Sequence, residues 1–75
     1  MQLKKGRYQH YKGNYYEVID SVRHSETEEV LVLYRQLYGD RALWVRPYNH
    51  FCEMVTVNDT KVSRFRFVDD SGETT

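Results

Sequence analysis

The sequence predicts an all-β domain, a single small barrel of five to six short strands. Strand-type segments alternate with turn signals at short intervals, and no segment makes a secure helix. Seven Tyr, three Phe and one Trp supply the large rings that a thin core needs. Because 75 residues leave room for one domain and Cys52 is the single cysteine, this core has to hold without a disulfide.

Two strands are expected in the first part of the chain. Residues 7–11 form the first, and the turn at residues 12–14 follows, where Gly13 or Asn14 can take a positive φ. Residues 15–23 alternate apolar and polar side chains with the period of two that indicates a half-buried strand. A polar loop at residues 24–29 ends this second strand.

Residues 30–37 fit two patterns. Their apolar side chains recur at helical spacing, and Gly39 stands where a helix would be capped. However, residues 30–34 are also a continuous apolar run, as in a strand that is buried on both faces. Because a strand at residues 42–46 needs a hairpin partner across the turn at Gly39, the strand interpretation is favoured.

The last part of the chain reads as a turn and two more strands. Pro47 ends the strand before it, since proline cannot donate to a ladder. Residues 47–51 have the length of one 3₁₀ turn. Strands are then expected at residues 52–57 and 61–68, on either side of a turn at residues 58–60.

The strand pattern places one domain at residues 6–68. Residues 1–5 are polar apart from Leu3, and residues 69–75 contain no large apolar side chain. Both ends are therefore expected to be flexible termini.

Charge and apolar patterning exclude several function classes. Eleven basic and eleven acidic residues give a net charge of zero, which argues against a general polyanion binder. No apolar run approaches the roughly 18 residues of a membrane span, and no signal peptide follows Met1. We therefore expect a cytoplasmic protein that does not contact membranes. Nothing in the sequence specifies its oligomeric state.

Catalytic and metal-binding constellations are not found in the sequence. His10, His24 and His50 are far apart and lack partners at metal-ligand spacing, so no metal or cofactor is expected. Cys52 stands beside Phe51 at the start of a predicted strand, where a buried, inert thiol is the default. The sequence therefore predicts a protein that is not an enzyme.

Three motifs and their order resemble a widespread bacterial family that is catalogued as a domain of unknown function. The motifs are GRYxHYKG at residues 6–13, HSET at residues 24–27 and WVRP at residues 44–47. The similarity extends to about residue 67. It implies an SH3-like β-barrel with a strand at residues 30–37, and it implies no activity. His50 departs from the pattern, because members often carry Met at this position.

The polar loop at residues 24–27 has a structural and a functional interpretation. The Ser25 and Thr27 hydroxyls can accept hydrogen bonds from nearby backbone amides and so fix a tight bend. Alternatively, His24 and Glu26 offer a donor and an acceptor to a ligand at the rim of a groove. The structural interpretation is favoured, and the two are compatible.

Alternation along the strand at residues 42–46 suggests an exposed patch. If Leu43 and Val45 point into the core, Trp44 and Arg46 lie together outside. Tryptophan beside arginine is a pairing that is enriched at interface hot spots, and it can also stack a base and hold a phosphate. The alternative is that the guanidinium of Arg46 merely covers the indole ring.

A binding module is the function that these residues favour. A protein or peptide is the expected partner of a patch at Trp44 and Arg46, extended by Tyr38 and Tyr48 and flanked by the loop at residues 24–26. The alternative is single-stranded RNA or DNA binding by the same aromatics, helped by the basic residues near the N-terminus. Steep salt dependence would distinguish nucleic acid from protein.

Overall fold

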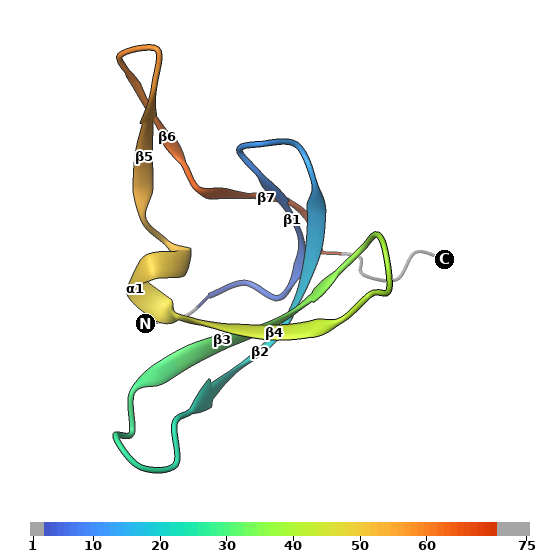
Figure 1. Cartoon of the computed structure of the whole chain (residues 1–75), viewed down its shortest axis with the longest axis vertical. Coiled ribbons are helices and arrows are strands. Elements are labelled where there is room, and N and C mark those ends of the chain that lie inside the picture. Colours follow the sequence, from blue (N-terminus) through green and yellow to red (C-terminus); the bar gives the residue numbers. More distant parts are fainter. Residues whose placement is uncertain (1–2, 71–75) are drawn as a thin grey trace.

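The computed structural model describes residues 3–70 and is mainly β (Figure 1). Its elements are β1 Gly6–His10, β2 Tyr15–Arg23, β3 Val30–Gln36, β4 Leu43–Pro47, α1 Tyr48–Phe51, β5 Met54–Val57, β6 Thr60–Ser63 and β7 Phe65–Asp69. Five strands form one antiparallel sheet in the order β4-β3-β2-β1-β7, and β5 pairs with β6 in a separate hairpin. The chain is mostly β with one short helix, as far as the fold class was predicted, and the strand interpretation of residues 30–37 is confirmed.

The predicted number of strands and the predicted barrel are wrong. Residues 3–70 contain seven strands rather than five or six, and they form no closed barrel, because β4 and β7 are the free ends of the sheet. The predicted strand at residues 61–68 divides at Arg64. There the amide donates to the Glu53 carbonyl at 3.0 Å, and the carbonyl accepts from the Tyr11 amide at 2.9 Å. The chain thus changes partner from β5 to β1.

The predicted 3₁₀ turn is a single α-helical turn. The Cys52 amide donates to the Tyr48 carbonyl at 3.1 Å, which is the spacing of an α-helix. Pro47 stands at its N-cap and ends β4 as expected. The turn directs Phe51 into the core, whereas Cys52 is exposed, so the prediction of a buried thiol is wrong.

The core lies on one side of the sheet, which we call the inner face. Its buried residues are Tyr8, Val18, Val32, Tyr34, Phe51 and Phe65. Phe51 and Phe65 stack in parallel with ring centroids 4.1 Å apart, and Tyr8 and Tyr34 contact Phe51 edge to face. Such ring pairs stabilise beyond their buried area, which suits a chain with few fully buried positions.

The register of β3 and β4 reverses the predicted orientation of β4. Opposed residues of an antiparallel pair share a face, and Trp44 lies opposite the buried Tyr34. Trp44 and Arg46 are therefore on the inner face. Leu43 and Val45, expected in the core, are on the outer face and are 51% and 52% exposed. Alternation defines the two faces of a strand, but only pairing with β3 decides which one is covered.

The described ends of the chain contact the sheet. Leu3 packs against the core, and the Tyr8 hydroxyl donates to the Lys4 carbonyl at 2.7 Å. Asp69, one residue beyond the predicted domain boundary, still belongs to β7 and accepts from Arg7 at 2.6 Å. The rest of the predicted flexible termini, residues 1–2 and 71–75, lies outside the described residues. No helix within residues 3–70 is long and apolar enough to cross a membrane.

Candidate functional site

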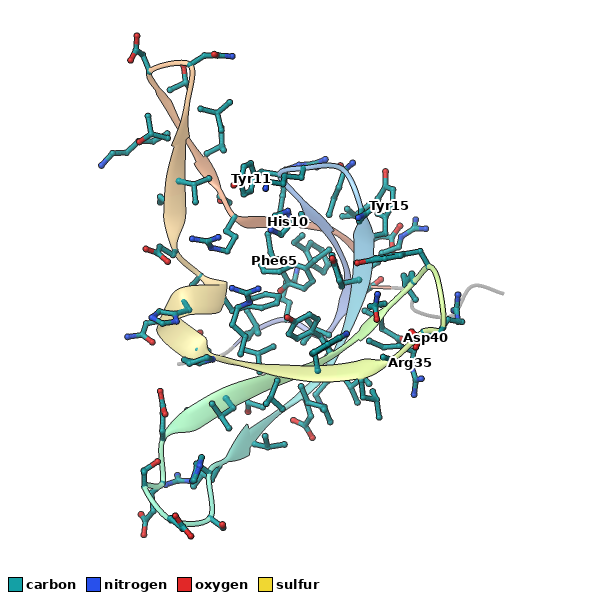
Figure 2. All side chains as sticks on the ribbon, in the orientation of Figure 1. His10, Tyr11, Tyr15, Arg35, Asp40 and Phe65 are labelled. Carbon is teal, nitrogen blue, oxygen red and sulfur yellow. The ribbon has the colours of Figure 1, made fainter. Side chains whose placement is uncertain are left out.

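A row of partly exposed rings continues the core along the inner face. Tyr16 is at its centre, with ring centroids 5.5 Å from Tyr34, 5.6 Å from Tyr38 and 6.3 Å from His10. Trp44 follows on β4, opposite Tyr34. At the other end the His10 ring contacts the Tyr11 ring at 4.7 Å, and Figure 2 shows these two rings and Phe65 on the side of the sheet nearer to the β5–β6 hairpin.

Hydrogen bonds hold the exposed rings in place. The Tyr16 and Tyr38 hydroxyls are 2.8 Å apart, and the Trp44 indole N–H donates to the Gln36 amide oxygen at 2.9 Å. Burial and the hydrogen bond with Tyr38 raise the pKa of Tyr16 to about 12, so its hydroxyl stays neutral. Side chains that are already ordered lose less conformational entropy when a ligand covers them.

Cations are interleaved with these rings. Arg46 lies over the Phe65 ring at 5.6 Å, and its Nε donates to the Tyr34 hydroxyl at 3.4 Å. Arg64 forms an ion pair with Glu53 at 3.2 Å. Burial lowers the pKa of His10, and the nearby charges of Arg46, Arg64 and Lys12 lower it further. A neutral His10 is also consistent with its Nδ1 accepting from the Lys12 amide at 3.1 Å.

A cleft of about 550 Å³ opens between the end of β1 and the β5–β6 hairpin. Its residues are Gln9, His10, Tyr11, Met54, Val57, Lys61, Val62, Ser63 and Arg66, none of them acidic. The cleft therefore combines two rings, an apolar wall and two full positive charges. Such surroundings accept a flat group between the ring and the apolar wall, with a negatively charged group beside it.

We call the inner-face row and this cleft, which share His10, the aromatic–cationic surface. Its rings are the exposed Tyr11, Tyr38 and Trp44 and the half-buried His10 and Tyr16. Its cations are Lys12, Arg46, Lys61, Arg64 and Arg66.

The structure brings together three of the six residues predicted for the site. Tyr38, Trp44 and Arg46 all lie on the aromatic–cationic surface. Tyr48 lies apart from them, on α1, where it lines a second cleft of about 670 Å³ beside Val18. Burial raises its pKa, and the neighbouring Cys52 contributes. The predicted extension of the patch to Tyr48 is therefore not what the structure shows.

His24 and Glu26 also lie apart, in the β2–β3 loop at the end of β3 that is remote from Trp44 (Figure 1). His24 Nδ1 accepts from the Glu26 and Thr27 amides at 3.1 and 3.4 Å. Thr27 Oγ1 accepts from the Glu29 amide at 3.1 Å. The loop thus caps itself, as the structural interpretation expected, with His24 rather than Ser25 as the second acceptor.

Sequence reasoning missed His10, Tyr11, Tyr16 and Arg64. The sequence did indicate His10, because side chains two residues apart in a strand share a face, which places His10 on the same face of β1 as Tyr8. The other residues needed the tertiary structure, since the charge of Arg64 acts on the pKa of His10 only after the chain changes partner between β6 and β7. No group of three His, Cys, Asp or Glu side chains within residues 3–70 is arranged to hold a metal ion.

Fold and surface together define a small antiparallel β domain with an open inner face of rings and cations. The chain belongs to the family described as "Protein of unknown function (DUF1653)", whose model matches residues 6–67. It is similar to the crystal structure of a DUF1653 protein from Bordetella bronchiseptica, with a TM-score of 0.85 and 29% identity over 97% of this chain and 96% of that one. No curated protein matches the chain. The family resemblance of the three motifs is confirmed.

Proposed function

We propose that this domain binds single-stranded nucleic acid on the aromatic–cationic surface. The observation that carries the proposal is the segregation of charge on a chain whose net charge is zero. Lys12, Arg46, Lys61 and Arg66 make no ion pair within residues 3–70. Elsewhere Lys5, Arg7 and Arg23 are each paired with a carboxylate. Lys4, Arg35 and Arg41, which also lie off this surface, make no ion pair within residues 3–70.

Each part of the surface has a counterpart in a single strand. Exposed rings stack on bases whatever their sequence, which contributes about 1–3 kcal/mol per base. Unpaired lysine and arginine side chains neutralise phosphates and release counterions. The acidic residues Glu26, Glu28 and Glu29 are in the β2–β3 loop, away from this surface, where they do not repel a polyanion.

A protein or peptide is the second candidate partner. The observation that favours it is the exposed indole of Trp44, two residues from Arg46 on the same face of an edge strand. Binding of this kind depends less on salt, because fewer counterions are released.

The experiment is an NMR titration of the labelled domain with a mixed-sequence single-stranded RNA, repeated at rising salt. We expect amide shifts around His10, Tyr11 and Trp44. The logarithm of the affinity should fall by about 0.7 per decade of salt for each phosphate neutralised. Bound phosphates would also offset the cations that lower the pKa of His10, so this pKa should rise in the complex.

Tyr11 and Tyr15 form a matched pair for this test, since they are 39% and 41% exposed. Tyr11 lines the cleft, whereas Tyr15 is not among the residues of the cleft and has Arg7 over its ring. We expect Tyr11→Ala to weaken RNA binding at least about fivefold and Tyr15→Ala to leave it unchanged. Equal losses, or binding that does not change with salt, would contradict the proposal. A silent spectrum would leave the protein partner.

A further inference from the structure

β4 ends the sheet with an unpaired backbone edge. The Gln36 amide donates to the Ala42 carbonyl at 3.0 Å, so these two opposed residues are a hydrogen-bonded pair. Hydrogen-bonded and non-bonded pairs alternate along an antiparallel ladder. Trp44 therefore directs its backbone groups toward β3, whereas Leu43 and Val45 direct theirs away from the sheet. No strand within residues 3–70 pairs with this outward edge.

Residues 43–45 of this edge lack the features that usually prevent strands from pairing, whereas Arg46 and Pro47 at the end of β4 provide them. Leu43, Trp44 and Val45 are three successive large apolar residues, each about half exposed. No charged side chain interrupts them, and the pairing of β3 with β4 has no bulge. Natural edge strands are usually protected by charges, proline or bulges.

The opposite edge of the sheet, β7, does carry such protection. Arg66 and Asp69 are charged, and the pairing of β1 with β7 is irregular between Arg7 and Tyr8. Addition of a strand is therefore favoured at β4 and disfavoured at β7. Any contact between two copies should then be two-fold, β4 with β4, and not the head-to-tail contact that produces fibres.

We propose that β4 pairs antiparallel with β4 of a second copy of this chain. In this register Trp44 lies opposite Trp44 of the second copy. The outward backbone groups of Leu43 in each copy then face the outward backbone groups of Val45 in the other copy. Four backbone hydrogen bonds then form. On the outer face each Leu43 contacts a Val45, and on the inner face the two indoles meet as a cross-strand pair.

The sequence on each side of this segment limits the pairing to it. Pro47 has no N–H to donate, and Arg41, which would lie opposite it, has a φ of 54° that no strand adopts. Arg46 would lie opposite the small Ala42, so no like charges face each other. The segment is thus complementary to itself in hydrogen bonding, apolar contact and charge.

The contact area determines how tight this dimer is. Three residues of edge strand bury less than the roughly 1,200 Å² of a standard interface, so the dimer should be weak and should depend on concentration. Pairing would place two aromatic–cationic surfaces side by side on one continuous sheet. That consequence for RNA binding rests on the proposed function, but the pairing itself does not.

The test measures mass and amide exchange of the full chain at about 20 µM and about 1 mM. We expect the mass to move toward that of two copies as concentration rises. Exchange of the Leu43 and Val45 amides should slow at least about tenfold, in proportion to the dimer formed. The Trp44 amide, already bonded to β3, should not change.

Val45→Pro and Val45→Thr provide a matched pair. Proline at Val45 removes an N–H that points away from the sheet and places its ring on the edge, so it should abolish the dimer and leave the β3–β4 ladder intact. Threonine keeps the N–H and the β-branched shape and should dimerise within about threefold of the parent chain. Circular dichroism verifies that both variants fold.

Three results would overturn the proposal. The first is the mass of a single copy at the higher concentration. The second is an exchange rate of the Leu43 and Val45 amides that does not change with concentration. The third is a folded Val45→Pro variant that still dimerises. A chain that remains single but gains protection at Leu43 on addition of an extended peptide would assign the edge to another protein. RNA binding measured at the lower concentration is independent of all these results.

Discussion

The inner and outer faces of the sheet differ although the same strands build both. β4 gives Trp44 to the inner face and Val45 to the outer face, and the two side chains are equally exposed. Trp44 is bonded to Gln36 and belongs to a row of rings and cations. Val45 lies opposite Leu33 on a face that no second layer covers within residues 3–70. Equal exposure therefore does not mean equal surroundings.

The core and the candidate binding surface therefore share one face of the sheet. Because the sheet does not close, the buried rings that stabilise it and the rings that contact solvent form one continuous row. Phe65 shows the transition, since it stacks on Phe51 on one side and carries Arg46 over its ring. Variants at equivalent places on the two faces should separate stability from binding.

The largest effect is expected at the centre of the inner-face core. Phe51→Ala removes a ring that is 1% exposed and stacked on Phe65, and should destabilise the chain by about 3–5 kcal/mol. Val45→Ala on the outer face should cost less than about 1 kcal/mol, because half of that side chain is already in water. Urea unfolding measures both, and similar costs would mean that the outer face is covered in solution.

Arg46 on the inner face and Arg35 on the outer face are a matched pair of cations for a binding test. Arg46→Gln removes an inner-face cation and should weaken RNA binding about tenfold while reducing the salt slope by about 0.7. Arg35 lies opposite Leu43 on the outer face, and its guanidinium donates to the Arg41 carbonyl at 3.0 Å. Arg35→Gln should therefore leave both the affinity and the slope unchanged. Fluorescence anisotropy over a salt series gives both values, and a matching loss in the two variants would place RNA elsewhere.

Adjacent tyrosines of β2 test a smaller effect. Tyr16→Phe removes the hydroxyl that meets Tyr38 at 2.8 Å and should cost about 1 kcal/mol. Tyr15→Phe should be neutral, because its hydroxyl has no hydrogen-bond partner within residues 3–70. Thermal unfolding compares the two. A neutral Tyr16→Phe would show that the exposed rings are not held by this bond.

The smallest effect is a pH dependence from His10. Its pKa in the folded chain lies below the ordinary value of 6.5, because burial and three cations disfavour its charged form. The unfolded chain then binds more protons, so stability is fully present above about pH 6.5 and is lost as pH falls through the folded pKa. His10→Gln should flatten this part of the profile of melting temperature against pH. A His10→Gln profile identical to that of the parent chain would contradict a contribution of His10 to the pH dependence of stability.

Local patterns predicted most elements of the fold. Alternation along residues 15–23 predicted β2, and the need for a hairpin partner decided in favour of β3 over a helix. The end of β4 at Pro47 could be predicted without tertiary contacts, since the missing N–H is a property of proline itself. The aromatic core also followed from composition, and three short motifs were enough to indicate the family. These features depend on residues close together in the chain.

Contacts between distant residues decided the remainder. Period-two alternation in β4 defines two faces, but Leu43 and Val45 are as apolar as Trp44, so the register with β3 chose which face was covered. The division of β6 from β7 at Arg64 required hydrogen bonds to Glu53 and Tyr11, far away in the chain. His10 and Arg46 both lie against the Phe65 ring for the same reason. Register is a property of paired strands and not of either strand alone, so the candidate surface emerged only from the folded chain.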